Sequence, residues 1–248
     1  MIDLDRIRDR IAQWWRYPQP SIFRTWASGQ YTDVIDTEFT AIRLASEESA
    51  KYVLSHMRTV PNFSCDYDLH KWVATTQVDT KLLLNGVILE FGVASGRTIN
   101  HFARLFPNRL IHGFDSFEGL PEDWTSRMPA GFFKRAKLPD TETNVKLWVG
   151  WFDETLPTFK NMYQSDPIAL LHIDCDLYSS TCTVLDALRE RLRPGTVIIF
   201  DEYMNYPGWQ QDEYRAWQKF VTENKMKYEY IGRVSRHQQV AVRITDVG

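Results

Sequence analysis

The sequence is poor in cysteine and has no excess of positive charge. Only three of its 248 residues are cysteine, and Cys65, Cys175 and Cys182 show no CxxC spacing. These are too few for a disulfide framework and lack the spacing of a cysteine metal site, so we expect reduced structural thiols. The formal net charge of −3 leaves no surplus of Lys and Arg to neutralise a phosphate backbone, which argues against nucleic acid as a partner.

The sequence also lacks a long apolar run. Its longest wholly apolar stretches have the length of strands rather than of membrane spans. Residues 1–6 include charged side chains and contain no apolar leader segment. We therefore expect a cytoplasmic protein that has no contact with a membrane and acts on a small molecule. Hydrophobic residues make up 44% of the chain and aromatic residues 14%, which is enough for a buried core.

The character of the sequence changes near residue 85. Before it, polar sequence with helical periodicity predicts three helices, near residues 2–16, 34–58 and 66–84. After it, short apolar runs alternate with helical stretches. We therefore divide the chain into a helical N-terminal cap, residues 1–84, and a core, residues 85–248, within the same domain. The cap offers a surface through which two copies could form a homodimer.

Strands and helices alternate in the first part of the core. The predicted strands are 87–91, 110–114, 146–149, 168–173 and 196–200, and the predicted helices are 97–105, 153–164 and 180–192. A further helix near 209–223 precedes two runs, 228–232 and 240–244, that suit an antiparallel pair. Strands alternating with helices indicate a parallel sheet. The sequence therefore predicts an α/β, Rossmann-like fold whose mostly parallel, seven-stranded sheet ends in a C-terminal antiparallel hairpin.

The first predicted strand runs into a glycine turn with the sequence EFGVASG. Its two glycines permit close approach of a cofactor to the backbone, and a helix follows. The turn lacks the middle glycine of the dinucleotide fingerprint and has an acid just before the first glycine. Such an acid can orient the amino-acid part of S-adenosylmethionine. The alternative is an ordinary tight turn between a strand and a helix. The candidate cofactor contacts here are Glu90, Gly92, Ala94, Ser95, Gly96 and Thr98.

Another acid, Asp115, follows the second predicted strand, roughly 20 residues after the turn, where a carboxylate can hold the ribose diol of a cofactor. Ser116 lies beside it and is a further candidate contact. After the third strand, Gly150 is a candidate for a backbone contact and Trp151 for an aromatic wall beside adenine. Trp151 is equally compatible with a place in the core.

Four acids follow the fourth and fifth predicted strands. They are Asp174, Asp176, Asp201 and Glu202. The carboxyl ends of parallel strands meet at one edge of a sheet, where ligands bind. Carboxylates packed together repel one another, and a hard divalent cation such as Mg²⁺ resolves this repulsion. A metal held by Asp174, Asp201 and Glu202 would bind a substrate hydroxyl oxygen in line with the cofactor's methyl group. Alternatively, some of these acids cap the helix at 181–192 or pair with nearby arginines.

Asp176 is not needed as a metal ligand and is the candidate acceptor for the hydroxyl proton. Asp174 and Asp176 are therefore the predicted catalytic pair, and Asp174 is also expected to contact the cofactor. His172 is an alternative base, although a lone histidine in an apolar strand is more often a hydrogen-bonded core residue.

Five motifs belong together in this sequence. They are LEFGVASG at 89–96, GFDSFEGLP at 113–121, DETLP at 153–157, HIDCDLY at 172–178 and FDEY at 200–203. Jointly they resemble the macrocin O-methyltransferase family, over residues 86–244. The resemblance implies a class I methyltransferase fold, S-adenosylmethionine as methyl donor, bound Mg²⁺, and methylation of a hydroxyl, often on deoxysugars of bacterial natural products.

The resemblance also assigns roles to the acids. It maps Asp174, Asp201 and Glu202 to metal positions and Asp176 to a proposed base. The family's usual Asp-Asp-Tyr is replaced here by Asp-Glu-Tyr. The glutamate is still an oxygen ligand, but its longer arm could shift the metal or leave it unbound.

Two other functions are open at this stage. The motif DCD at 174–176 imitates the Asp-x-Asp signature with which metal-dependent glycosyltransferases bind a nucleotide-sugar. The glycine turn and Asp115 argue against that function. The altered Glu202 is compatible with a non-catalytic nucleotide-binding or scaffold protein.

Two segments are candidates for the substrate side. Residues 121–140 contain aromatic, glycine and basic residues and form either a mobile lid or a solvated insertion. Residues 206–209 follow the fifth strand, and their aromatic side chains suit a sugar or ring substrate. Trp209 could instead anchor its helix.

Overall fold

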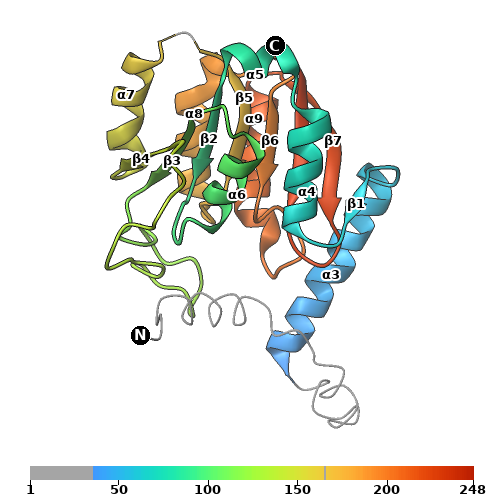
Figure 1. Ribbon diagram of the computed structural model, residues 1–248. Helices are drawn as coiled ribbons and strands as arrows, with labels where there is room; N and C mark the ends of the chain where they lie inside the picture. Colours follow the sequence, from blue (N-terminus) through green and yellow to red (C-terminus); the bar gives the residue numbers. More distant parts are fainter. Residues whose placement is uncertain (1–35, 165) are drawn as a thin grey trace.

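An eight-stranded sheet organises the described part of the chain, residues 36–164 and 166–248 of the computed structural model (Figure 1). Its strands are β1 (Asn62–Phe63), β2 (Val87–Phe91), β3 (Ile111–Asp115), β4 (Val145–Val149), β5 (Ile168–Ile173), β6 (Val197–Phe200), β7 (Lys227–Val234) and β8 (Val240–Asp246). Their order is β1-β7-β8-β6-β5-β2-β3-β4, and among them β8 pairs antiparallel with β6 and β7. The predicted α/β fold, with a mostly parallel sheet and an antiparallel C-terminal hairpin, is confirmed.

The predicted count of seven strands was wrong by one strand. The additional strand, β1, lies in the residues that we assigned to the helical cap. It pairs in parallel with β7, through Asn62 with Arg233 and Phe63 with Val234. A strand of two residues is too short to show an alternation of apolar and polar side chains, so its sequence carries no strand signal.

Helices cover the sheet and connect its strands. They are α3 (Thr37–His56), α4 (Asp66–Trp72), η1 (Val73–Gln77), α5 (Thr80–Asn85), α6 (Arg97–Leu105), α7 (Phe152–Met162), α8 (Tyr178–Leu188), η2 (Arg189–Arg191), η3 (Trp209–Gln211) and α9 (Glu213–Glu223). The predicted helix 66–84 is divided, because α5 has its own N-cap: the Asp79 carboxylate accepts hydrogen bonds from the N–H groups of Lys81 and Leu82. The predicted helix 2–16 lies outside the described residues.

Different helices cover the two faces of the sheet. Side chains alternate along a strand, so Leu89 and Phe91 of β2 pack with α7, α8 and α9, whereas Ile88 packs with α4 and α6. Figure 1 shows α4 and α6 on the near side of the sheet. We call these two sides the α8/α9 face and the α4/α6 face. β2 and β5 are buried along their whole length because both faces are covered.

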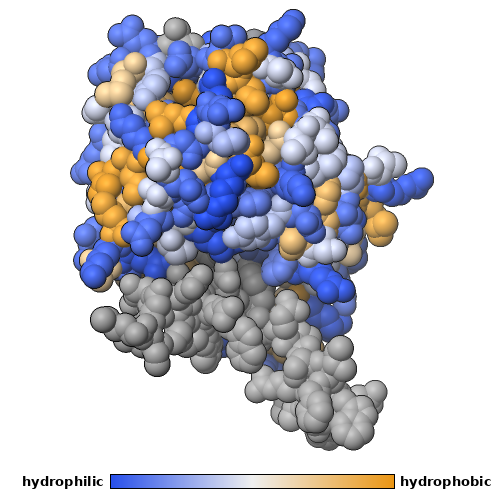
Figure 2. All heavy atoms as spheres, viewed as in Figure 1, coloured by the Kyte–Doolittle hydropathy of each residue, from blue (hydrophilic) through white to orange (hydrophobic). Residues whose placement is uncertain are grey.

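The surface is mixed in character. Figure 2 shows apolar side chains in several groups among hydrophilic ones. On α3, Leu44 and Leu54 are exposed. This helix lies at the β1 end of the sheet (Figure 1), where the Tyr52 hydroxyl is 2.6 Å from that of Tyr230 on β7. Within residues 36–248, apart from residue 165, no helix combines the length and the apolar character needed to cross a bilayer.

Candidate functional site

The glycine turn joins β2 to α6 at the point where the strand order reverses. β2 lies between β3 and β5, and open α/β sheets bind ligands at such a reversal. Gly92 (φ +93°) and Gly96 (φ +77°) adopt left-handed conformations. A Cβ atom on Gly92 would lie 1.7 Å from the carbonyl oxygen of Asp174, closer than any side chain tolerates. Glycine at this position therefore permits β2 and β5 to end side by side.

Asp115, at the end of β3, holds the turn in shape. Its Oδ2 accepts hydrogen bonds from the N–H groups of Val93 at 2.9 Å and Ala94 at 2.8 Å, and its Oδ1 accepts one from Phe117 at 2.6 Å. Each carboxylate oxygen has two lone pairs, so Oδ2 is fully used and Oδ1 retains the capacity to accept a hydrogen bond from one ribose hydroxyl. The predicted ribose ligand thus also organises the backbone of the turn.

A cleft of about 1000 Å³, counted out to open solvent, lies beside the turn. The predicted site residues that line it are Gly92, Ala94, Ser95, Thr98, Asp115, Ser116, Trp151, Asp174 and Asp176. The predicted site residues outside its lining are Glu90, Gly96, Gly150, Asp201 and Glu202. Further lining residues include Arg97 and Phe152, which were not predicted from the sequence, and Phe133 and Arg135, which belong to the segment 121–140 that was a candidate for the substrate side. The cleft is open to solvent, and its walls bring the predicted cofactor residues together with Asp174 and Asp176.

The segment between β3 and β4 forms part of the cleft wall. Phe133 and Arg135 line the cleft, and the N–H group of Arg135 donates to the carbonyl of Phe117 at 2.9 Å. The same segment packs on the glycine turn, because a Cβ atom on Gly96 would lie only 2.9 Å from Cβ of Pro139. The region predicted as a lid or an insertion therefore contacts the cleft directly.

Residues 206–209, the second candidate segment for the substrate side, do not line the cleft. Trp209 is buried in the core, with 1% of its surface exposed. The Tyr206 hydroxyl and Trp124 Nε1 both donate to Oδ2 of Asp212, each at 3.0 Å. None of these four residues is among those that line the cleft. They form an aromatic network that anchors the loop before α9.

Three carboxylates come together at the strand ends, and we call them the cleft acids. Asp174, Asp176 and Glu202 each offer an oxygen within 4.8 Å of the others. The sequence placed Asp201 in this set in place of Asp176. The structure instead groups Asp201 with two histidines on the α4/α6 face. Carboxylate oxygens are the donors that Mg²⁺ prefers, so the chemistry of the cleft acids fits that ion.

Glu213, at the start of α9, is a buried acid that was not predicted from the sequence. Its Oε2 accepts a hydrogen bond from the N–H group of Glu202 at 3.1 Å. Burial, followed by the charges of Asp174 and Asp176, raises the pKa of Glu213 well above its usual range. This repulsion is what a divalent cation among the cleft acids would relieve. In the sequence, Glu213 resembles any acid in the first turn of a helix.

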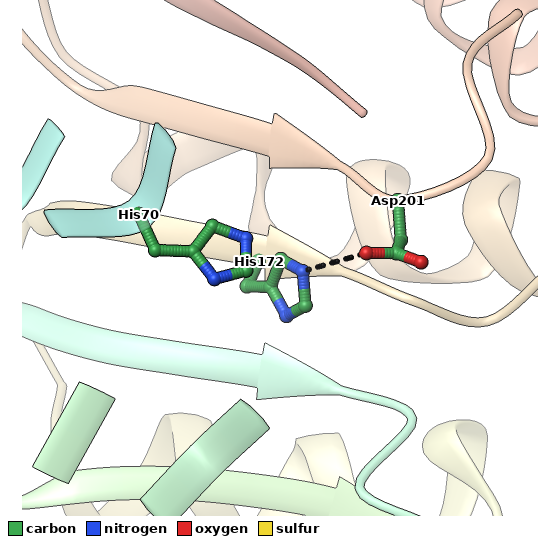
Figure 3. Close-up of side chains that lie close together, drawn as sticks. All are labelled: His70, His172 and Asp201. Atoms are coloured by element: carbon green, nitrogen blue, oxygen red, sulfur yellow. Dashed lines mark ion pairs between the residues drawn. The ribbon is translucent and has the colours of Figure 1, made fainter. Parts of the chain in front are cut away.

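A second group lies on the α4/α6 face, and we call His70, Glu90, His172 and Asp201 the inner cluster. All four residues are buried. Nδ1 of His172 is 3.1 Å from Oε2 of Glu90, and its Nε2 is 3.7 Å from Oδ1 of Asp201 (Figure 3). Burial lowers the pKa of His172, but the carboxylates of Asp201 and Glu90 outweigh burial and raise it to about 10. Glu90 and His172 thus contact each other and do not line the cleft.

His70, on α4, is the member of the inner cluster that the sequence did not reveal. Its side chain has no exposed surface, and burial lowers its pKa well below the usual range, so the ring is neutral. The centre of its ring lies 5.2 Å from that of His172. Among the described residues, neither ring nitrogen of His70 has a hydrogen-bond partner. A single histidine in a predicted helix carries no sequence signal of such a neighbour.

Comparison with known proteins gives the following matches. The family model described as macrocin-O-methyltransferase (TylF) matches residues 130–236. Demethyldecarbamoylnovobiocin O-methyltransferase of Streptomyces niveus is 39% identical over 86 residues, which are 34% of this chain and 30% of that protein. A tetracenomycin 4′-O-methyltransferase of Streptomyces olivaceus, named for a rhamnosyl-tetracenomycin substrate, is 38% identical over 116 residues, which are 38% of this chain and 42% of that protein. Each match spans less than half of the curated relative.

Solved structures match over more of the chain. The calicheamicin methyltransferase CalS11 superposes with a TM-score of 0.57 and 28% identity, covering 71% of this chain and 77% of its own. The O-methyltransferase NovP has a TM-score of 0.52 and 23% identity, covering 72% and 79%, a likeness that supports the fold alone. The neighbours are Rossmann-like methyltransferases, and the chain resembles the macrocin O-methyltransferase family, as its motifs predicted.

Proposed function

We propose that the protein is an S-adenosylmethionine-dependent O-methyltransferase that acts on a hydroxyl group of a small molecule. The observation that carries this proposal is the cleft at the strand-order reversal, where the glycine turn, Asp115, Asp174 and Asp176 form one lining. Methyl transfer to oxygen requires a cofactor site and a group that accepts the hydroxyl proton, held side by side.

On the cofactor side, Oδ1 of Asp115 would accept a hydrogen bond from a ribose hydroxyl, and Trp151 would pack against the adenine ring. The backbone from Gly92 to Gly96 gives the close approach that the cofactor needs. S-adenosylmethionine supplies an electrophilic methyl group. Because the carbonyl of Asp174 packs against Gly92, the same strand end connects the cofactor side with the cleft acids.

On the acceptor side, we propose that the cleft acids hold Mg²⁺, which would lower the pKa of an acceptor hydroxyl. Asp174, which lines the cleft, would orient the hydroxyl, and Glu202, which is buried outside that lining, would only hold the ion. As the hydroxyl oxygen forms its bond to the methyl carbon, the bond between that carbon and the cofactor's sulfur would break, S-adenosylhomocysteine would leave, and a carboxylate oxygen of Asp176 would accept the hydroxyl proton. Asp201 is the alternative third ligand. Its Oδ1 faces His172, so it would use Oδ2.

The acceptor class is supported by the names of the relatives. One is named for a 4′-O-methylation on a rhamnosyl group, and CalS11 is described as a TDP-rhamnose 3′-O-methyltransferase. Phe133 and Phe152 give the cleft aromatic faces of the kind that pack on sugar rings. We propose a sugar hydroxyl, free or attached to a natural product, as the acceptor.

We also propose a cytoplasmic location and a homodimer. The three cysteines are unpaired with one another, which suits a reducing compartment. The exposed side chains of Leu44 and Leu54 on α3 are the candidate dimer surface. Light scattering on the purified protein tests the dimer, and a monomeric mass would refute it.

Isothermal calorimetry with S-adenosylmethionine, S-adenosylhomocysteine, NAD and a UDP-sugar separates the functions that the sequence left open. We expect both adenosyl ligands to bind and the other two ligands not to bind. Binding of the UDP-sugar alone would identify the glycosyltransferase. Adenosyl binding without methyl transfer to any hydroxyl of a panel of rhamnosides would favour a non-catalytic protein. Failure of both adenosyl ligands to bind would refute the proposal.

A further inference from the structure

The inner cluster has no part in the proposed methyl transfer, and its contacts are unusual for a protein core. One ligand atom each from His70, His172 and Asp201 lies within 4.8 Å of the others, and all three residues are buried. They come from α4, β5 and the end of β6, so they connect the helical region before residue 85 with the centre of the sheet.

His70 provides the first argument for a ligand. Buried polar groups almost always have a hydrogen-bond partner, yet both ring nitrogens of this fully buried side chain have none within the described part of the chain. Its ring extends from α4 towards His172, whose far side faces Asp201 (Figure 3). An uncharged imidazole in this position offers a lone pair to the space between the three side chains.

Glu90 provides the second argument. In the tautomer that carries its proton on Nδ1, His172 donates to Oε2 of Glu90 at 3.1 Å. The lone pair of Nε2 then faces Asp201, 3.7 Å away. Histidines that bind metals usually donate their other ring N–H group to a carboxylate in this way, which fixes the tautomer and orients the ring.

We propose that His70, His172 and Asp201 bind a zinc ion, with Glu90 as the carboxylate that orients His172. Two imidazole nitrogens and one carboxylate oxygen are donors typical of Zn²⁺, whereas the all-oxygen cleft acids suit Mg²⁺. The ligand atoms of His70, His172 and Asp201 lie within 4.8 Å of one another, and binding would draw each of them to the usual distance of about 2 Å from the ion. The divalent charge balances the two buried carboxylates of Glu90 and Asp201.

The function of this ion is structural. The site is buried, since the three ligands are each less than 5% exposed, and it joins α4 to the ends of β5 and β6. A tetrahedral ion needs a fourth donor, which the second oxygen of Asp201 or a water molecule would provide. An imidazolium at His172 between Glu90 and Asp201 is the competing arrangement. That imidazolium satisfies the two carboxylates but leaves both nitrogens of His70 without a partner among residues 36–164 and 166–248. A zinc ion would bind one of these two nitrogens.

The test uses the full chain, exposed to Zn²⁺ and then dialysed against buffer containing excess Mg²⁺. Metal content is measured by inductively coupled plasma mass spectrometry. We expect one zinc ion per chain in the wild type, loss of that zinc in His70→Gln, and retention in Glu202→Gln, which alters the cleft acids instead. Wild-type protein without zinc would overturn the proposal. So would zinc that survives in His70→Gln but is lost from Glu202→Gln.

A second measurement covers the case in which His70→Gln does not fold. Wild-type protein is loaded with Co²⁺, and its visible spectrum is recorded in excess Mg²⁺. Tetrahedral coordination, as expected for a zinc site, predicts intense d–d bands and a melting temperature raised by the bound ion. The weak bands of an octahedral site, as expected for Co²⁺ bound at the cleft acids, or no bound Co²⁺, would contradict the assignment. Neither measurement depends on methyl transfer, so the zinc site and the proposed function can fail independently.

Discussion

The cleft acids and the inner cluster are made from neighbouring residues and yet differ in chemistry. Asp201 and Glu202 are consecutive at the end of β6. Along that strand Ile199 packs on the α4/α6 face and Phe200 on the α8/α9 face, so Asp201 continues the first face and Glu202 the second. A shift of one position along the chain therefore moves an acid from the inner cluster, which contains histidine, to the cleft acids, which offer only oxygen.

The largest effect is expected where the cleft acids meet the acceptor. Asp176→Asn keeps the shape of the side chain and tolerates the left-handed backbone at this position (φ +62°), but it removes the proton acceptor. We expect kcat to fall by about 10²- to 10⁴-fold with unchanged affinity for S-adenosylhomocysteine. Asp186→Asn on the exposed side of α8 is the control. A variant that retains wild-type kcat would remove Asp176 from the chemistry.

Gly92→Ala tests the contact that joins the glycine turn to Asp174. The new Cβ would lie 1.7 Å from the Asp174 carbonyl oxygen, so we expect the free energy of unfolding to fall by about 3 kcal/mol or more. Gly208 has a similar φ of +87°, but a Cβ atom there would have no atom of the described residues within 4 Å. Gly208→Ala should therefore cost only about 1 kcal/mol. Equal losses in urea unfolding would contradict the tight approach of β2 to β5.

Asp115→Asn weakens the cofactor-binding part of the cleft and leaves the cleft acids and the inner cluster unchanged. The variant removes the charge-assisted hydrogen bond to a ribose hydroxyl and also weakens the hydrogen bonds that hold the glycine turn, which together predict about a tenfold or greater increase in Kd for S-adenosylhomocysteine by calorimetry. Asp123→Asn is the matched control, because its Oδ1 accepts a hydrogen bond from Ala130 N–H at 2.7 Å outside the cleft lining. If both variants bind the ligand as tightly as wild type, Asp115 does not hold the ribose.

The smallest effect concerns the inner cluster of metal-free protein. The pKa of His172 is raised from 6.5 to about 10 by its two carboxylate neighbours. Its contribution to stability is therefore fully present below pH 6.5 and is lost as the pH rises towards 10. The difference in unfolding free energy between wild type and His172→Gln should shrink across that window. A difference that does not change with pH would show that His172 is not charged in the metal-free protein.

Much of the fold could be predicted because its signals are local. Apolar runs alternating with helical stretches indicated the parallel core, and the antiparallel pair after α9 followed from two further runs. β1 could not be predicted, since two residues carry no period. The break after η1 depends on Asp79, which is the N-cap of α5. This N-cap signal is present in the sequence, but the prediction of one helix over 66–84 did not use it.

Part of the site was also predictable from local sequence signals. Strand ends and turns located Gly92, Asp115 and Asp174 at the cleft. The alternation of side chains along β6 indicates that Asp201 and Glu202 face opposite sides of the sheet. The sequence prediction grouped the acids only by the strand ends that they follow, so it placed both at one site. His70 was not readable, because its place beside His172 depends on how α4 packs against the sheet, which is a contact between distant parts of the chain.

The most direct test of the proposed function is a crystal structure of the protein with S-adenosylhomocysteine and Mg²⁺. We predict the adenosyl ligand in the cleft, with a ribose hydroxyl on the Asp115 carboxylate and an ion bound by oxygens of Asp174 and Glu202. A structure at saturating ligand with the adenosyl group outside the cleft, or with no ion at these carboxylates, would contradict it.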